Sequence, residues 1–298
     1  LGVTRQLEKE RIDIFHGLSN ELPLNIHKSE VKSIVTIHDL IFLRYPQYYH
    51  SIDRNIYTYK FRKACENADR IIAISECTKR DIIEYFGIPA DKIEVVYQGC
   101  DPSFIHPVAA EKKREIRAKY QLPDHYILNV GSIEERKNAL SAVQALMMLP
   151  EQIHLVIVGR HTEYTDKIER FIKENKLEER VHIISNVPFD DLPVFYQLAE
   201  IFVYPSRFEG FGIPIIEALY SGIPVVAATG SCLEEAGGPD SIYVHPDDIK
   251  GMADAFKQIY SDTERKKEMI EKGQKFAKRF SEEKQAVEIL NIYKKLMK

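Results

Sequence analysis

The sequence predicts an α/β protein built from two doubly wound domains, each with a parallel sheet. Short β-branched runs alternate with helical stretches along all 298 residues, which is typical of parallel strands joined by helices. The alternation pauses once, from Gln98 to Pro107, where turn residues and two prolines replace the periodicity. A chain of this length that is 44% hydrophobic can bury two ordinary cores. We therefore expect two domains joined by a linker, with a ligand-binding cleft between them.

The elements expected before the linker make up a first domain, residues 1–105. Its strands are predicted at 12–16, 33–38, 70–75 and 93–97, and its helices near 53–67 and 77–86. The second domain, residues 106–280, is expected to hold strands at 126–130, 154–158, 181–184, 201–204, 224–227 and 242–244, with helices between them. Apolar residues spaced for one helical face predict a last helix over residues 281–298.

The composition excludes several classes of protein. A formal net charge of -4 argues against a nucleic-acid-binding protein. The four cysteines form no C-x-x-C pair and show no zinc-ligand spacing, which indicates reduced thiols and no metal site. No apolar run is long enough to span a membrane, and no signal peptide opens the chain. We expect a cytoplasmic protein that is attached at most peripherally, at the inner face of the plasma membrane.

The most informative segment is 209–218, which reads E-G-F-G-I-P-I-I-E-A and follows a predicted strand. Pro214 fits the first turn of a helix, and the two glycines let the backbone approach a ligand closely. Backbone amides at a helix start favour an anion such as phosphate. The carboxylates of Glu209 and Glu217 would repel phosphate, so they are better suited to hydroxyl groups. A ligand that carries both phosphate and hydroxyl groups is a nucleotide sugar. The segment also has a purely structural interpretation, because a strand, a Gly-rich turn and a helix occur in any α/β protein.

A second polar segment, 129–138, follows the first strand of the second domain and reads N-V-G-S-I-E-E-R-K-N. Gly131 permits a tight turn, and the adjacent cations Arg136 and Lys137 offer charge-assisted bonds to a diphosphate. Taken alone, this segment also fits a solvated charged loop. Together with the downstream glutamates it predicts a phosphate-binding loop.

A histidine ends a strand in the first domain, within V-T-I-H-D-L. At that position His38 would lie at the ligand-binding edge of the sheet and could bond a sugar hydroxyl or a departing charge. A lone His-Asp pair is more often a structural hydrogen bond than a catalytic dyad. His16 ends an earlier strand and is a second candidate, on the acceptor side.

These segments resemble motifs of glycosyltransferase family 4, whose members are retaining enzymes with the GT-B fold of two Rossmann-like domains. The E-x(7)-E pair is similar to the family signature, as are the R-K-N loop and the V-V-Y-Q-G-C-D junction at 95–101. The resemblance implies that Glu209 faces the donor sugar, that Glu217 accepts hydrogen bonds from the ribose, and that Lys137 contacts the pyrophosphate. It also implies that the last helix returns to the first domain.

Site residues follow from this resemblance. Ser132 departs from the family pattern, since many members carry Arg there, and Arg136 could take over that contact with the phosphates. The segment 186–192 resembles the loop whose backbone reads the nucleobase. The catalytic residues implied are His38 and Glu209, and the donor-binding residues are Gly131, Ser132, Arg136, Lys137, Val187, Gly210, Phe211, Gly212, Ile213 and Glu217.

The resemblance is strongest to bacterial mannosyltransferases of surface-polysaccharide assembly. It implies a retaining hexosyltransferase that moves mannose from GDP-mannose, or a hexose from a UDP-sugar, to a glycan or lipid-linked saccharide. No D-x-D loop is present, so we expect no metal and no other cofactor. Basic residues from Lys266 to Arg279 leave open a contact with an anionic membrane, although interleaved acids favour a solvated helix face.

Two alternatives to transfer stay open. One is a sugar-nucleotide-binding module that is inactive or regulatory, and the other is a GT-B nucleotide-sugar epimerase. Family members begin with a strand, a Gly-rich loop and a long helix, whereas this chain starts at Leu1 in what resembles the end of that helix. We therefore expect an N-terminally truncated first domain, which makes transfer by this chain less certain than donor binding.

Overall fold

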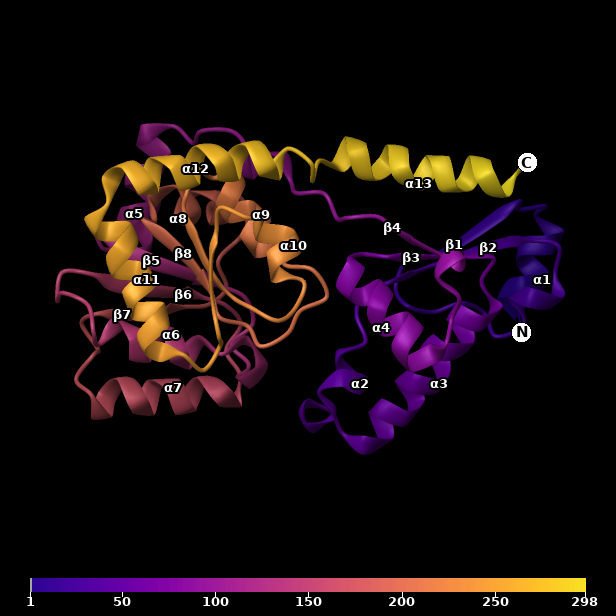
Figure 1. Cartoon of the computed structure of the whole chain (residues 1–298), viewed down its shortest axis with the longest axis horizontal. Helices are drawn as coiled ribbons and strands as arrows, with labels where there is room; N and C mark the ends of the chain where they lie inside the picture. The colour runs from indigo at the N-terminus through magenta and orange to yellow at the C-terminus, as the bar shows by residue number, and fades with distance from the viewer. Residues whose placement is uncertain (1) are drawn as a thin grey trace. The chain divides into compact units, whose positions relative to one another are not determined.

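The computed structural model describes residues 2–298 and divides the chain into two compact units (Figure 1). Unit 1 comprises Leu1–Gly99, Glu209–Phe211 and Glu282–Lys298, and unit 2 comprises Cys100–Phe208 and Gly212–Ser281. Three segments that are far apart in the sequence therefore contribute to unit 1. Among the described residues, no helix combines the length and the apolar character needed to cross a membrane.

Unit 1 is built on a four-stranded parallel sheet in the order β1-β2-β3-β4. Its strands are β1 (Ile14–Gly17), β2 (Lys32–Ile37), β3 (Arg70–Ala73) and β4 (Ile93–Val95). Its helices are α1 (Gly2–Lys9), α2 (Ile41–Arg44), α3 (Ser51–Asn67), α4 (Glu76–Phe86) and α13 (Glu282–Leu296), with short 3-10 turns η1 (Ile26–Lys28), η2 (Pro46–Tyr48) and η3 (Ala90–Lys92).

The four strands predicted in this half are present, but β1, β3 and β4 are shorter than predicted and β2 is displaced by one residue. The strand predicted over 93–97 ends at Val95. The changes at β1 and β3 have identifiable reasons. The strand predicted to start at Ile12 starts at Ile14, because the Ile12 amide donates to Leu7 O at 3.0 Å and closes α1. The strand predicted over 70–75 ends at Ala73. Ser75 is instead the N-cap of α4, and its hydroxyl accepts from the amide of Thr78 at 2.9 Å.

The last helix, α13, packs on the sheet of unit 1. Ile292 is buried in one small cluster with Ile34, Ile72 and Val96. Ile34 and Ile72 lie on β2 and β3, so the helix covers one face of the sheet. The hydroxyl of Tyr293 bonds Nδ1 of His16 at 2.7 Å.

Unit 2 is built on a six-stranded parallel sheet in the order β10-β9-β8-β5-β6-β7. Its strands are β5 (Tyr126–Val130), β6 (His154–Val158), β7 (Val181–Ile184), β8 (Ile201–Tyr204), β9 (Val225–Ala228) and β10 (Ile242–Val244). Five of the six strands have the predicted bounds, and β9 is displaced by one residue. Along the chain, the strands run outward from β5 in one direction and from β8 in the other, so the topological switch point lies between β5 and β8.

Helices cover the sheet of unit 2 (Figure 1). They are α5 (Ala110–Tyr120), α6 (Ala139–Leu146), α7 (Glu163–Glu174), α8 (Leu192–Leu198), α9 (Ile213–Tyr220), α10 (Leu233–Gly237), α11 (Ile249–Ser261) and α12 (Thr263–Ala277), with 3-10 turns η4 (Pro102–Phe104), η5 (Glu135–Lys137) and η6 (Phe189–Asp191). The main core packs α6, α7, α11 and α12 against one another and the strands.

Candidate functional site

The switch point of unit 2 brings two of the predicted segments together. β5 and β8 are hydrogen-bonded neighbours, with Ile127 opposite Ile201 and Leu128 opposite Phe202. The loop with Arg136 and Lys137 follows β5, and the chain that leads to α9 follows β8. Because the strands are parallel, both segments leave the sheet at the same edge. That edge, beside the switch point, is where ligands bind in open α/β sheets.

The loop after β5 has a defined geometry. Gly131 has φ +148°, a conformation that side-chain-bearing residues rarely adopt, and a Cβ there would lie 3.8 Å from Nζ of Lys137. The loop ends at Asn138, which is left-handed at φ 57° and buried. The Asn138 side-chain amide donates to the carbonyls of Pro205 and Pro246 at 3.3 and 2.8 Å, so the lysine-bearing turn is fixed to two neighbouring loops.

The two predicted cations make different contacts. Nζ of Lys137 donates to the hydroxyl of Tyr204 at 2.8 Å and lies 5.3 Å from the centre of its ring. The Arg136 guanidinium, which is only 13% exposed, donates to the carbonyl of Phe208. At least part of the hydrogen-bonding capacity of Arg136 therefore serves the protein itself. Lys137 is the better candidate for a phosphate contact.

Helix α9 carries the second glutamate of the pair. Gly212 is its N-cap at φ 126°, and Pro214 lies in its first turn, as the sequence predicts. Glu217 is buried, and its Oε2 accepts a hydrogen bond from the hydroxyl of Tyr196 at 2.6 Å. Burial raises the pKa of Glu217 to about 7, against the lowering effect of the Tyr196 bond, while nearby Asp101 raises it further. The charge on Glu217 therefore changes close to neutral pH.

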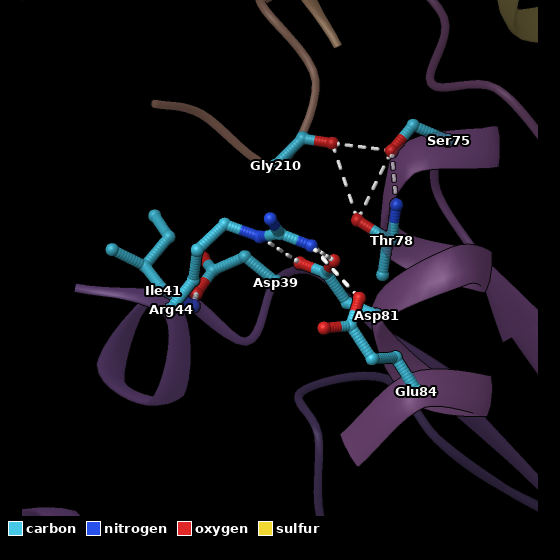
Figure 2. Close-up of polar contacts among 8 residues, drawn as sticks. All are labelled: Asp39, Ile41, Arg44, Ser75, Thr78, Asp81, Glu84 and Gly210. Atoms are coloured by element: carbon cyan, nitrogen blue, oxygen red, sulfur yellow. Dashed lines mark hydrogen bonds and ion pairs between the residues drawn. The ribbon is translucent and has the colours of Figure 1, made fainter. Parts of the chain in front are cut away.

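The first glutamate belongs to unit 1, together with His38. The carbonyl of Gly210 accepts hydrogen bonds from the hydroxyls of Ser75 at 2.7 Å and Thr78 at 3.3 Å (Figure 2). Thr78 also donates to the carbonyl of His38 at 3.2 Å. A Cβ on Gly210 would lie 2.2 Å from that same His38 oxygen, so only glycine fits there. Buried Glu209 is thus in a segment packed directly against the backbone of His38.

His38 is held on two sides. Its amide donates to Oδ1 of Asn20 at 2.7 Å, and its Nε2 lies 2.8 Å from the carbonyl of Leu18. A carbonyl can only accept, so Nε2 carries the proton in this bond. The Asp39 carboxylate accepts from the amide of Ile41 at 3.0 Å, which is a local turn contact (Figure 2).

Figure 2 also shows the ion pair that joins α2 to α4 near these residues. The Arg44 guanidinium bonds buried Asp81, and it lies 3.4 Å from Glu84 at the surface. Burial raises the pKa of Asp81, and the Arg44 bond opposes that effect. This pair supports the region around His38 rather than the site itself.

His16, the second histidine candidate, uses both ring nitrogens within unit 1. Nδ1 bonds Tyr293, and Nε2 bonds the hydroxyl of Thr36 at 2.8 Å. Burial lowers the pKa of His16. These contacts give His16 a structural role in holding α13 to the sheet.

The other predicted residues lie on loops or at a helix start, and their roles stay predictions. Ser132 and Ile213 are half-buried next to Gly131 and Gly212. Val187 follows β7, two strands from β5.

Sequence reasoning missed the two tyrosines that bond the proposed donor residues, Tyr196 and Tyr204. No motif or spacing marks them, because the contacts form only when α8 and β8 pack beside α9 and the β5 loop. It also missed a group of three exposed residues, His161, Asp166 and Glu169, whose potential ligand atoms lie within 4.8 Å of one another in the described chain. His161 is 3.8 Å from Asp166 and 3.6 Å from Glu169, as expected for surface ion pairs.

Comparison with known proteins gives matches along nearly the whole chain. Residues 112–276 match the family described as glycosyl transferases group 1, and residues 1–104 match Glycosyltransferase Family 4. O-antigen chain mannosyltransferase B of Escherichia coli is 31% identical over 95% of this chain and 74% of its own length. Serotype-specific mannosyltransferase WbdA of Escherichia coli is 29% identical over 84% of this chain, and the match spans only 32% of WbdA.

Solved structures show the same fold. Anabaena Alr3699/HepE, in complex with UDP and glucose, superposes with a TM-score of 0.82 at 18% identity, over 98% of this chain and 80% of its own. This likeness identifies the fold as GT-B, with two Rossmann-like units. The predicted fold class is therefore confirmed.

Proposed function

The chain belongs to the glycosyltransferases, with a group 1 domain and a family 4 domain, and from this premise we propose that it is a retaining mannosyltransferase. The reaction would move mannose from GDP-mannose to a hydroxyl of a glycan or a lipid-linked saccharide. The observation that supports the proposal is that the loop of Lys137 follows β5 and the helix of Glu217 follows β8, the two neighbouring strands at the switch point of unit 2.

The two residues suit the two polar parts of a nucleotide sugar. Lys137 is a point charge beside half-buried Gly131, which has no side chain to keep a diphosphate from its backbone. The start of α9, with Gly212 as its N-cap, adds backbone amides on the same side. Glu217 is an acceptor, which suits the ribose hydroxyls. A metal-independent transferase needs such cations and amides to stabilise the leaving diphosphate.

Glu209 and His38 are proposed to act on the sugar. Glu209 would accept hydrogen bonds from hydroxyls of the donor sugar. Because Nε2 of His38 donates to the carbonyl of Leu18, Nδ1 is the ring nitrogen that is proposed to meet a sugar hydroxyl. Both roles follow from the family resemblance.

Mannose and GDP are proposed on the strength of the relatives. Both Escherichia coli relatives described above carry the name mannosyltransferase. A UDP-hexose is the second choice, because HepE, which shares the fold, was solved with UDP and glucose.

A lipid-linked acceptor would bring the protein to the inner face of the plasma membrane. The basic residues of α12 give this little support. Lys267 pairs with Glu264, and Lys272 pairs with Glu268 and Asp240, so these lysines are balanced by acids.

A panel of nucleotide sugars tests the proposal. The chain is incubated with GDP-mannose, UDP-glucose and UDP-N-acetylglucosamine and a mannose-containing oligosaccharide, and release of nucleoside diphosphate is followed. We expect GDP release from GDP-mannose and, by NMR of the product, an α-linkage that retains the donor configuration. Release from a UDP-sugar alone would overturn the donor assignment, and an inverted product would overturn the retaining mechanism.

A further inference from the structure

Two buried tyrosines bond the two charged residues that are assigned to the donor. Tyr196 on α8 is fully buried, and its hydroxyl donates to Oε2 of Glu217 on α9 at 2.6 Å. Tyr204 ends β8, is 2% exposed, and its hydroxyl oxygen accepts from Nζ of Lys137 at 2.8 Å. An ammonium can only donate, so the direction of the second bond is fixed.

The two tyrosines belong to one aromatic row. The ring of Tyr196 lies 5.3 Å from that of Phe202, and the ring of Phe202 lies 5.9 Å from that of Tyr204 at an interplanar angle of 19°. Phe202 is fully buried between them in this row. Close-packed rings of this kind have little freedom to move, so the hydroxyls at both ends are held in place.

Buried tyrosine hydroxyls need a partner, so a bond alone is weak evidence of a role. A charged partner alone does not separate these two tyrosines from others in unit 2, because the hydroxyl of Tyr120 donates to the carboxylate of Asp191 at 2.9 Å. What separates them is that their partners belong to the two segments that follow β5 and β8. The hydroxyl of Tyr126 donates to the carbonyl of Phe195 at 2.6 Å, and that of Tyr243 to the carbonyl of Gly238 at 2.6 Å. Tyr196 and Tyr204 instead bond charged side chains at the switch point.

We propose that Tyr196 and Tyr204 are positioning residues of the donor site, Tyr196 for the ribose-binding carboxylate and Tyr204 for the diphosphate-binding ammonium. This inference rests on the proposed function of Glu217 and Lys137. A carboxylate has about four lone-pair positions and an ammonium has three N–H donors, and each tyrosine occupies one of them. The bond therefore sets the orientation of the group that meets the ligand without using up its capacity to bind.

The two positions make separable predictions. Loss of the Tyr196 hydroxyl should weaken every ligand that carries ribose hydroxyls, because Glu217 loses its orientation. Loss of the Tyr204 hydroxyl should weaken only ligands that carry phosphates, because Lys137 keeps its charge but not its placement. If a hydroxyl had a purely structural role, its loss would lower the affinity for all of these ligands by a similar factor.

Calorimetry with Tyr196→Phe and Tyr204→Phe tests this, with GDP, guanosine and 2′,3′-dideoxy-GDP as probes and the uridine series in parallel. We expect Tyr196→Phe to lower the affinity for GDP and guanosine about tenfold or more, and to change the affinity for dideoxy-GDP little. We expect Tyr204→Phe to lower the affinity for GDP by a similar factor and to change the affinity for guanosine little. Tyr126→Phe, which loses an equally buried hydroxyl bonded to a backbone carbonyl, is the matched control and should leave the ligand discrimination unchanged.

A pH profile supplies a readout that packing alone would not move. Among the described residues, the groups that shift the pKa of Glu217 are Tyr196 on α8 and Asp101, which immediately precedes η4. Guanosine affinity should rise with pH through about 7 as Glu217 ionises. In Tyr196→Phe the midpoint should move to higher pH, because the lost bond favours the ionised carboxylate.

The outcomes separate the inference from the proposed function. If Lys137→Ala and Glu217→Gln impair binding while both tyrosine variants behave like Tyr126→Phe, the positioning roles are wrong and the donor site stands. If the unaltered chain binds neither GDP nor UDP, the proposed function fails and the inference fails with it. Discrimination by ligand class together with the shifted midpoint supports both.

Discussion

Glu217, the proposed ribose ligand, is a buried carboxyl group whose burial disfavours its charged form. Its pKa in the folded chain, about 7, lies above the ordinary value of 4.5. A raised pKa means that its contribution to stability is complete below about pH 4.5 and is lost as the pH rises through 7. Above neutral pH the folded protein carries a buried negative charge, which accepts the hydrogen bond from the Tyr196 hydroxyl.

Replacing Glu217 with Gln should therefore have opposite effects on stability and on binding. At pH 8 the free energy of unfolding should rise, by on the order of 3 kcal/mol, since the buried charge is gone. At pH 5 it should change little. Nucleoside diphosphate affinity at pH 8 should fall by about 1.5–3 kcal/mol, the range for a hydrogen bond to a charged group.

Chemical denaturation at the two pH values and calorimetry at pH 8 measure these changes. Glu174→Gln, on the exposed face of α7, is the control and should alter neither quantity. If the Glu217→Gln variant is less stable at pH 8 than the unaltered chain, this account of the carboxyl is contradicted.

The sequence predicts the charged residues of the proposed site but not the side chains that bond them. Lys137 and Glu217 are visible as parts of motifs. Tyr196 and Tyr204 are not, since they lie 21 and 67 residues from the side chains they bond and follow no spacing rule. Such contacts are decided by which strands and helices become neighbours, which a local pattern does not encode.

At the level of elements, the segment that carries Glu209 depends on a single glycine. Gly210 has no room for a side chain because the carbonyl of His38 would lie 2.2 Å from a Cβ. Two hydroxyls, from the N-cap Ser75 and from Thr78 on α4, hold the Gly210 carbonyl at the same place. A shift of this segment would displace Glu209 and His38 relative to each other.

Gly210→Ala should therefore reduce sugar transfer by more than tenfold and lower the free energy of unfolding by about 1–3 kcal/mol, the usual cost of overpacking. Transfer is measured in the nucleotide-sugar assay and stability by denaturation. The control is Gly87→Ala, where open space surrounds the site of the Cβ and only the φ of +68° opposes the change. It should lose about 1 kcal/mol and keep its activity. Full transfer by Gly210→Ala would show that this packing is not needed.

Strand bounds were predicted best where the strand is a continuous apolar run between turns. Five strands of unit 2 match at both ends, from β5 to β8 and at β10. In unit 1 some strand ends differ from the prediction because residues near them bond a helix terminus instead of the sheet. Ser75 caps α4, and the amide of Ile12 closes α1. Caps depend on which backbone groups are left over after the helix forms, so they limit the precision of a prediction from apolar patterns.

For the whole molecule, the alternation of strands and helices was enough to predict two doubly wound units, and the comparisons confirm the GT-B fold. The assignment of Glu209–Phe211 to unit 1 could not be predicted, because it depends on the hydroxyl contacts at the start of α4. The switch point between β5 and β8 explains why the two strongest motifs lie where they do. Each follows one of those two strands.

The central claim is that this switch point binds a nucleoside diphosphate and that Lys137 holds its phosphates. The most direct test is titration of GDP and guanosine into the unaltered chain, into Lys137→Ala and into Lys173→Ala, a control on the exposed face of α7 with the same loss of charge. We predict that Lys137→Ala lowers the affinity for GDP at least about tenfold and leaves the affinity for guanosine unchanged. Lys173→Ala should bind both ligands like the unaltered chain. Equal losses of GDP and guanosine in Lys137→Ala, or no loss of either, would contradict the claim.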